Sequence, residues 1–417
     1  NLPHSCFGMI ILIFSLSAHS STRTSNKLWK NGNRYACSDY ANIMIQARRP
    51  RRTHTALSAL FALAGLLLIM GLLGNPVQAR EKRPKATQRP PIMLVNPEVQ
   101  AFIDDMQARH GFEPAPLSQL FETQRPDNRV IRIMAPAPVQ LTPDWQSYRA
   151  RFVNSRRINR GLQFWEGHAE TLHRAAETYG VPPEIIVAII GVETEYGRNM
   201  GSFNIFNALA TIGFYGERRR EFFRSELEQY LLLARDNSMD LTTTRGSFAG
   251  ALGIPQFMPS SQRRWGVDFD GDGKVDLIHS PTDAIGSVGN FLKSHGWIKG
   301  ETPVISVIAP DPLPEAYQKV DIKPAIAVTQ FRDSGFGFGE QGLTAGLPDA
   351  PATLVSLSSP KIATQYWLGF NNYYVVTRYN RSAAYAMSVI ELAEAIRQAR
   401  GTPDSSATTE LEQRIGG

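Results

Sequence analysis

A mainly helical fold with one β-rich insertion, an α+β protein, is predicted for this chain by three observations. Apolar residues recur with helical spacing through much of residues 98–302 and again over 383–399. Between 303 and 370 the pattern changes to short β-rich runs separated by Gly and Pro, which is typical of a small antiparallel sheet. With 417 residues, 42% of them hydrophobic and 20% charged, the chain can bury a sizeable core.

The segment 44–79 has the organisation of an export signal. Met44 begins an Arg-rich stretch, an apolar run covers 56–73, and small residues precede a cleavage site after Ala79. We therefore expect a protein of the bacterial periplasm that is released by this cleavage. An uncleaved membrane anchor is the alternative, because the apolar run is nearly long enough to span a bilayer. Residues 1–43 begin with Asn rather than Met and are interpreted as upstream sequence from a misassigned start.

Charge and cysteine content exclude several classes of function. The formal charge of +6 is concentrated before residue 80, and the rest of the chain holds 36 basic and 37 acidic residues. This balance gives no electrostatic case for nucleic acid. The only cysteines, Cys6 and Cys37, precede the export signal, so the mature chain has no disulfide, no cysteine nucleophile and no Cys-zinc site.

The elements follow in order along the mature chain. Residues 80–97 are basic and Pro-rich and are predicted to be a mobile linker. Asn96 and Pro97 begin a helix that Gly111 ends near His110. Further helices are predicted at 143–156, 160–179, 183–196, 217–236 and 282–295. After the β-rich insertion at 303–370, residues 371–400 hold a C-terminal segment and helix, and 401–417 are expected to be a disordered tail.

A carboxylate ends one of these helices in apolar surroundings. In the stretch IIVAIIGVETEYG, residues 185–197, Glu193 shares its helix face with Ile186, Ile189 and Ile190. Burial and the negative end of the helix dipole should both raise the pKa of this carboxyl. A carboxylic acid still protonated near neutral pH is what glycosidic bond cleavage needs. The alternative is a structural glutamate paired with an arginine.

A glycine-rich stretch, residues 246–266, offers neutral hydrogen-bonding groups. Its small residues let backbones approach closely, and Ser247, Gln256 and Ser260 suit a polyol or an acetamido sugar. The stretch contains no acid and so cannot supply the second carboxylate that most glycosidases use.

An acidic loop over 268–283 resembles an EF-hand. Alternating acids and a glycine at the sharp turn suit a hard cation, with Lys274 offering only its backbone carbonyl. His279 stands where a bidentate Glu would normally close the site, so calcium and a solvated turn both remain open at this point. The residues that carry the pattern are Asp268, Asp270, Asp272, Gly273, Lys274 and Asp276.

Five motifs together resemble the membrane-bound lytic murein transglycosylase B family, in the same order and over residues 95–400. The resemblance implies a lysozyme-like helical core, an additional helical domain and a small β domain. It also implies cleavage of peptidoglycan between N-acetylmuramic acid and N-acetylglucosamine to leave a 1,6-anhydro product. The motifs are GVETEYG at 191–197, GSFAGALGIPQFMPSS at 246–261, DFDGDGKVDL at 268–277, DAIGSVGNFLKSHGW at 283–297 and TRYNRSAAYAM at 377–387.

The resemblance also implies roles for single residues. Glu193 stands at the position of a single catalytic acid and base, which fits the missing second carboxylate. Arg218 and Arg219 match a pair of arginines suited to carboxylates of the muramyl unit, with a solvated basic face as the alternative. Phe222 stands where the family can present a tyrosine, which puts one polar contact in doubt. The matched sugar-contacting positions, for which core packing is the alternative at the two tyrosines, are Ser247, Gln256, Tyr379, Asn380 and Tyr385.

For the acidic loop, the resemblance implies a structural calcium ion, and no cofactor for catalysis. Asp283 would close the loop beyond the usual EF-hand length, and the implied ligands are Asp268, Asp270, Asp272, Lys274 and Asp283. We expect a monomer that binds peptidoglycan glycan strands and has wall-synthesis proteins as possible partners. A hydrolytic muramidase and a non-catalytic wall-binding scaffold remain as rival functions.

Overall fold

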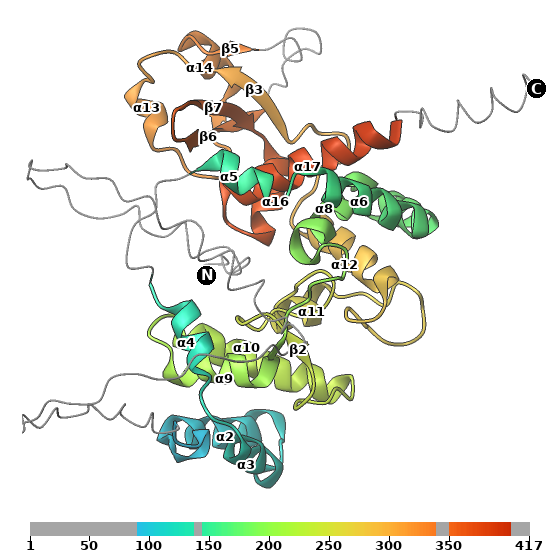
Figure 1. Cartoon of the computed structure of the whole chain (residues 1–417), viewed down its shortest axis with the longest axis vertical. Helices are drawn as coiled ribbons and strands as arrows, with labels where there is room; N and C mark the ends of the chain where they lie inside the picture. The colour runs from blue at the N-terminus through green and yellow to red at the C-terminus, as the bar shows by residue number, and fades with distance from the viewer. Residues whose placement is uncertain (1–89, 137–143, 339–349, 402–417) are drawn as a thin grey trace, which may run out of the picture. The chain divides into compact units, whose positions relative to one another are not determined.

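The computed structural model describes residues 90–136, 144–338 and 350–401 (Figure 1). The predicted export signal, the residues before it, the linker up to residue 89 and the tail from residue 402 lie outside the described residues.

The described chain begins with four short helical elements, η2 (Met93–Val95), α2 (Pro97–His110), α3 (Pro114–Thr123) and α4 (Asn128–Met134). The side chain of Asn96 caps α2, and Gly111 ends it in the left-handed conformation, as the sequence predicts. Met93 is fully buried, so this end of the predicted linker packs on the helical region. Helix α3 was not predicted, because its prolines suggested a loop; Pro114 instead occupies the first helical position, where proline is favoured.

The next helices differ from the predicted boundaries. The range 143–156 contains only α5 (Trp145–Ala150) and the start of α6 (Ser155–Gly167), because the Asn154 side chain caps a new helix there. The range 160–179 is likewise divided, since His168 leaves the helical conformation before α7 (Ala169–Tyr179).

Helix α8 (Pro183–Thr194) lies at the centre of the larger hydrophobic core. Every residue from Ile185 to Val192 is buried, which is the pattern of a helix that is apolar on all sides. It packs against α6, α7, α12 (Pro281–Ser294) and α17 (Ala383–Gly401). The end of α8 is therefore held from several directions.

A second core surrounds α9 (Ile205–Tyr215) and α10 (Arg220–Asp236), which lie side by side in Figure 1. Two-residue strands precede and follow this pair, β1 (Phe203–Asn204) and β2 (Arg245–Gly246), and they pair antiparallel. Helix α11 (Pro259–Trp265) then leads into the acidic loop and α12.

The β-rich insertion forms a small antiparallel sheet, as predicted, and its strand order is β4-β6-β7-β3-β5. Its long strands β6 and β7 form a hairpin (Figure 1). A third hydrophobic core includes residues of these strands and of α14. Helix α16 leads from the sheet to α17. The elements are β3 (Val304–Ile308), α13 (Glu315–Gln318), β4 (Ile326–Ala327), α14 (Val328–Asp333), β5 (Gly337–Phe338), β6 (Pro351–Ser359), β7 (Ile362–Gly369) and α16 (Asn371–Tyr379).

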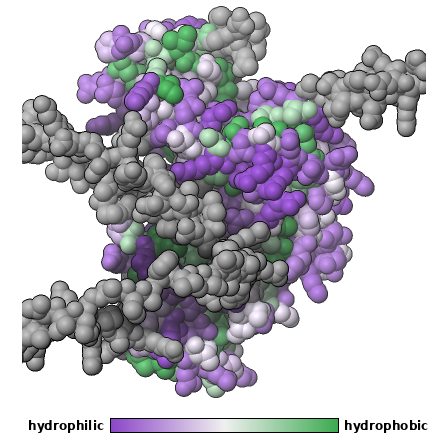
Figure 2. Space-filling view, viewed as in Figure 1, coloured by the Kyte–Doolittle hydropathy of each residue, from purple (hydrophilic) through white to green (hydrophobic). Residues whose placement is uncertain are grey.

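The visible surface is mainly hydrophilic, with small apolar patches between the purple areas (Figure 2). Within the described ranges, no single helix is long and apolar enough to cross a membrane, although α7 and α8 pass that test together as a pair bent by 113°.

Candidate active site

Glu193 lies in the last turn of α8, where the helix meets the C-terminal segment. Its side chain is only partly exposed, although every neighbouring position from Ile185 to Val192 is buried. Loss of hydration raises the pKa of the Glu193 carboxyl from 4.5 to about 7, and a hydrogen bond from Tyr385 partly opposes this rise. The carboxyl is therefore protonated in a large share of molecules near neutral pH.

The hydrogen bond to Glu193 comes from Tyr385 on α17. The Tyr385 hydroxyl donates to Oε1 of Glu193 over 2.6 Å, and the tyrosine itself is fully buried. Burial raises the pKa of Tyr385 well above its ordinary value, and the charge of Glu193 adds to the rise. Tyr385 is thus a permanent hydrogen-bond donor to the glutamate.

Glu195, two residues further on, forms ion pairs with two arginines. Its Oε1 accepts from Arg160 and lies 3.1 Å from Nε of Arg156. In the part of the chain that the structure describes, no arginine or lysine pairs with Glu193. The structural alternative of an arginine pair therefore applies to Glu195 and not to Glu193.

The backbone directly after Glu193 is strained. Glu195 and Tyr196 have φ values of 52° and 63°, in the left-handed region that non-glycine residues seldom adopt, and Gly197 follows at 79°. The Tyr196 hydroxyl donates to the carbonyl of Arg157 over 2.9 Å. Its ring lies so close to Gly191 that a Cβ there would meet the hydroxyl oxygen at 2.6 Å. Packing of Tyr196 thus fixes the turn that presents Glu193.

Two further tyrosines lie near the glutamate. Tyr379 stacks on Tyr385, with ring centroids 6.5 Å apart and planes inclined by 15°, and its hydroxyl donates to the carbonyl of Pro255. Tyr148 on α5 was not singled out from the sequence. Burial raises the pKa of Tyr148, and the negative charge of Glu193 raises it further. Helix α5 packs against α17, the helix that carries Tyr385.

The hydroxyl of Tyr148 is buried and has no hydrogen-bond partner among the described residues. Buried polar atoms are nearly always hydrogen-bonded, so this exception requires an explanation. The sequence contains no signal for it, because the residue lies 45 positions before Glu193 on a separate short helix. Asn380, which follows Tyr379, also has a buried side-chain oxygen without a partner within the described ranges.

The glycine-rich stretch is attached directly to the end of α8. Thr194 donates its hydroxyl to the carbonyl of Ile254 over 2.7 Å. The side-chain amide of Gln256 donates to the carbonyl of Met200 over 3.1 Å and to that of Gly253 over 2.9 Å. The Ser247 hydroxyl accepts from the amide of Ala251 at 2.9 Å. Ser247 and Gln256 are nearly buried, and these hydrogen bonds hold the loop in shape.

The two candidate substrate-binding arginines lie on an exposed part of the chain, unlike the nearly buried Ser247 and Gln256. Arg218 and Arg219 are exposed before the start of α10, and Arg219 has a left-handed φ of 56°. The Arg219 guanidinium lies over the ring of Phe222, 4.2 Å from its centroid. Phe222 therefore supports this arginine through the face of its ring.

The acidic loop brings three of its carboxylates together. One oxygen each of Asp268, Asp270 and Asp283 lies within 4.8 Å of the others. Burial and the nearby charge of Asp270 raise the pKa of Asp283, which is 1% exposed, although backbone amides donate to it. Asp272 lies outside this cluster and accepts from the amide of Lys274. Carboxylate oxygens around a small space are the ligands that a hard cation prefers.

A protonated carboxylic acid at the end of a buried helix, surrounded by tyrosines and neutral hydrogen-bonding groups, is suited to breaking glycosidic bonds. Comparisons with known proteins indicate the same class of enzyme. Residues 95–394 match the family model described as the transglycosylase SLT domain, and the chain belongs to this family.

Three relatives support this assignment. The chain is 41% identical over 316 residues to the membrane-bound lytic murein transglycosylase B of Escherichia coli, covering 73% of this chain and 84% of that protein. The E. coli lytic transglycosylase Slt35, solved with calcium, is 39% identical, with a TM-score of 0.68 over 77% of this chain and 99% of that one. SltB3 from Pseudomonas aeruginosa, solved with NAG-anhNAM-pentapeptide, is 29% identical, with a TM-score of 0.64 over 72% and 79% of the two chains.

The fold is accordingly lysozyme-like, and the protein is a lytic murein transglycosylase, a lyase that acts on peptidoglycan.

Proposed function

We propose that this enzyme cleaves the β-1,4 bond between N-acetylmuramic acid and N-acetylglucosamine with Glu193 as its single acid and base. The observation that carries the proposal is the position of Glu193, a carboxyl with a pKa of about 7 that bonds only to an uncharged donor. The substrate-binding residues proposed around it are Arg218, Arg219, Ser247, Gln256, Tyr379, Asn380 and Tyr385, together with Tyr148.

In the first step, the Glu193 carboxyl donates its proton to the bridging oxygen. The bond from the anomeric carbon of the muramyl unit to that oxygen breaks, and positive charge develops on the sugar ring. Because Tyr385 already donates to Oε1, the proton to be transferred is best held on Oε2. The neutral surroundings favour the protonated starting form.

In the second step, the Glu193 carboxylate removes the proton from the C6 hydroxyl of the same muramyl unit. The C6 oxygen then bonds to the anomeric carbon, which closes the 1,6-anhydro ring and restores the acid. An intramolecular nucleophile has a high effective concentration, so neither an activated water nor a second carboxylate is needed. The Tyr385 hydrogen bond stabilises the carboxylate formed between the steps.

The test compares products and two matched variants. Purified murein treated with the wild-type enzyme should yield 1,6-anhydro ends, whereas free reducing ends would favour a hydrolytic muramidase. Glu193→Gln should lower turnover by roughly 10²–10⁴-fold, the usual contribution of a general acid or base. Glu195→Gln is the matched control. Glu195 lies two residues away and forms ion pairs with Arg156 and Arg160, so this variant should lose far less turnover. Murein clearance retained by Glu193→Gln would exclude Glu193 as the acid, and no clearance by the wild type would favour a wall-binding scaffold.

The acidic loop is proposed to hold a structural calcium ion. Asp268, Asp270 and Asp283 would be its carboxylate ligands from the observed cluster, with Asp272 and the carbonyl of Lys274 completing the set. Such an ion would tie the loop to the start of α12, where Asp283 lies, and would take no part in catalysis. The calcium in the Slt35 structure supports this assignment.

Export to the periplasm through the signal at 44–79 fits an enzyme whose substrate is the cell wall. The cleavage site after Ala79 would release the enzyme, whereas the E. coli relative is described as membrane-bound. N-terminal sequencing of the mature protein distinguishes these forms.

A further inference from the structure

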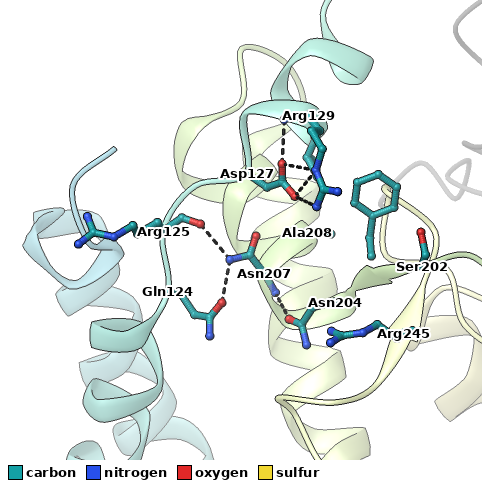
Figure 3. Close-up of a pocket in the computed structure, with 11 residues that line it drawn as sticks. Gln124, Arg125, Asp127, Arg129, Ser202, Asn204, Asn207, Ala208 and Arg245 are labelled. Carbon is teal, nitrogen blue, oxygen red and sulfur yellow. Dashed lines mark hydrogen bonds and ion pairs between the residues drawn. The ribbon is translucent and has the colours of Figure 1, made fainter. Parts of the chain in front are cut away.

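The polar pocket between the α3–α4 connection and the start of α9, about 370 Å³ in volume, shows how polar groups away from Glu193 satisfy one another (Figure 3). Asp127 pairs with Arg129 over 2.6 Å, and the side-chain amide of Asn207 donates to Oε1 of Gln124 over 2.8 Å. Polar and charged groups inside proteins are nearly always bonded in this way. A buried charge without an acid partner therefore requires a reason.

Arg157 on α6 is a buried charge of this kind. Its side chain is 9% exposed, and within the described ranges no aspartate or glutamate forms an ion pair with it. The ion pairs of this helix instead join Arg156 and Arg160 to Glu195. Nε of Arg157 is also buried and has no hydrogen-bond partner among the described residues. Burial of such a charge costs free energy, which a strong hydrogen bond from its other nitrogen atoms can offset.

Arg157 forms that hydrogen bond with the end of α8. Its Nη1 donates to the carbonyl of Gly191, two residues before Glu193. The same carbonyl accepts from the amide of Glu195 over 3.1 Å, a bond that closes the last turn of α8. The carbonyl of Arg157 in turn accepts from the Tyr196 hydroxyl over 2.9 Å. One residue of α6 is thus bonded to the backbone before Glu193 and to a side chain after it.

The surroundings of Arg157 fix its own position. Its guanidinium carbon lies 5.3 Å from the centroid of the Phe152 ring, and its amide donates to the Asn154 side chain that caps α6. Helix α6 packs against α8 and comes so close to the following turn that a Cβ at Gly161 would meet the Tyr196 hydroxyl oxygen at 2.6 Å. The bond to α8 therefore starts from a closely packed helix.

A cation is well placed at this end of a helix. Carbonyl groups at the C-terminal end carry the negative end of the helix dipole, and a guanidinium can both bond to them and offset their charge. In catalysis, a displacement of about 1 Å can lower the rate by about 10²-fold, because the reacting atoms must be aligned. A contact that fixes the last turn of α8 therefore bears directly on the placement of Glu193.

We propose that Arg157 is a positioning residue for the cleavage reaction. Through the Gly191 carbonyl it holds the last turn of α8 so that the Glu193 carboxyl faces the bridging oxygen. The proposal rests on the proposed function, in which Glu193 is the acid and base. Arg157 is buried and acts through the backbone of α8, so it should affect turnover and not substrate binding.

The test separates kcat from KM on soluble uncrosslinked glycan strands. Arg157→Ala should lower kcat roughly 10- to 100-fold with KM unchanged, because the acid is displaced while the groove stays intact. Added guanidinium ion should restore part of the lost kcat, since it can occupy the space that the side chain leaves. Arg157→Lys keeps the charge but not the planar fork, so it should lose several-fold in kcat. The rates are measured below the melting transition of every variant.

Arg174→Ala is the matched control. Arg174 on α7 also donates to a backbone carbonyl, that of Phe269, and its guanidinium lies 4.2 Å from the centroid of the Phe269 ring. That carbonyl belongs to the acidic loop and not to α8, so this variant should keep the wild-type kcat even if its melting temperature falls.

Wild-type kcat in Arg157→Ala, or a loss that appears in KM, would overturn the proposal. A loss of kcat that guanidinium leaves unchanged would indicate damage to the core and would also count against it. If Arg157→Ala does not fold, wild-type kcat in Arg157→Lys would overturn it. Failure of the proposed function is seen separately, because Glu193→Gln would then stay active. An inactive Glu193→Gln beside a fully active Arg157→Ala would refute only the role of Arg157.

Discussion

The hydroxyl of Tyr385 donates to Oε1 of Glu193 over 2.6 Å, from a helix that begins 190 residues after the glutamate. This single contact joins the C-terminal helix α17 to the end of α8. It opposes the rise that burial causes, and the pKa of Glu193 is about 7 with both effects present, so this contact helps to set the balance between the acid and base forms of Glu193.

Tyr385→Phe should shift the pH dependence of turnover upward. Without the donor, the pKa of Glu193 rises by roughly one unit, because a hydrogen bond to a charged group contributes on the order of 1.5 kcal/mol. The fall in rate on the alkaline side should move to higher pH, and the maximum rate should drop because the carboxylate is less stable. Tyr379→Phe is the control, since its hydroxyl donates to Pro255 and not to Glu193. Identical pH profiles for Tyr385→Phe and the wild type would contradict this role.

Glu193→Gln should stabilise the folded protein, relative to the wild type, at neutral and higher pH but not below about pH 4.5. The folded pKa of about 7 exceeds the ordinary value of 4.5, so the native state binds more protons than the unfolded state between these pH values. Stability of the wild type therefore falls as pH rises from about 4.5 through 7, by about 3 kcal/mol in total. The variant has no carboxyl to ionise at this position, so its stability does not fall in this way. Its denaturant midpoint should exceed that of the wild type by an amount that grows between pH 4.5 and 7. A difference that is constant from pH 4 to pH 8 would mean that Glu193 is not perturbed.

Gly191→Ala should destabilise the protein and reduce activity together. The added Cβ would meet the Tyr196 hydroxyl oxygen at 2.6 Å and its Cζ at 2.7 Å, and the ring cannot move without releasing the strained turn after Glu193. We expect a loss of about 1–3 kcal/mol in unfolding free energy. Gly167→Ala is the matched control, because nothing lies within 4 Å of a Cβ at that position on α6. Equal melting temperatures for the two variants would refute the packing argument.

Tyr148→Phe should lower activity without lowering stability. The buried hydroxyl has no partner among the described residues, so its removal costs no hydrogen bond and relieves an unsatisfied polar atom. If the hydroxyl binds substrate, turnover should fall by about tenfold while the melting temperature stays equal or rises. Tyr230→Phe, which removes another buried hydroxyl, on α10, should leave turnover unchanged.

Removal of calcium should lower the melting temperature by several degrees. At a hundredfold excess over its dissociation constant, an ion bound only to the folded state contributes about 2.7 kcal/mol. A chelator should remove this stabilisation and added calcium should restore it, whereas magnesium should substitute poorly. Asp270→Ala should abolish most of the response with residual activity at low temperature, and Asp333→Ala on α14 should retain it. An unchanged melting curve in chelator, with no metal in the purified protein, would mean that the loop is a solvated turn and not a calcium site.

Local chemistry made much of the architecture predictable. Asn96 and Gly111 mark the ends of α2, and the all-apolar stretch 185–192 indicates a buried helix. The short β-rich runs over 303–370 form the predicted sheet. The errors lie where local signals compete: prolines at 114 and 116 suggested a loop although they begin α3, and a continuous pattern at 160–179 is broken at His168.

By itself, the sequence determined that Glu193 lies at the end of an apolar helix and that acids alternate along one loop, since both are read from residue spacing. Only the structure shows that three of these carboxylates, Asp268, Asp270 and Asp283, come together. Only the tertiary structure decided that the arginines pair with Glu195, that Tyr385 bonds to Glu193, and that Tyr148 lies unpartnered beside it. These partners come from helices α5, α6 and α17, which lie far from α8 along the chain. Their contacts result from how the helices pack around α8, and packing depends on all the surrounding side chains at once, so no local pattern encodes it.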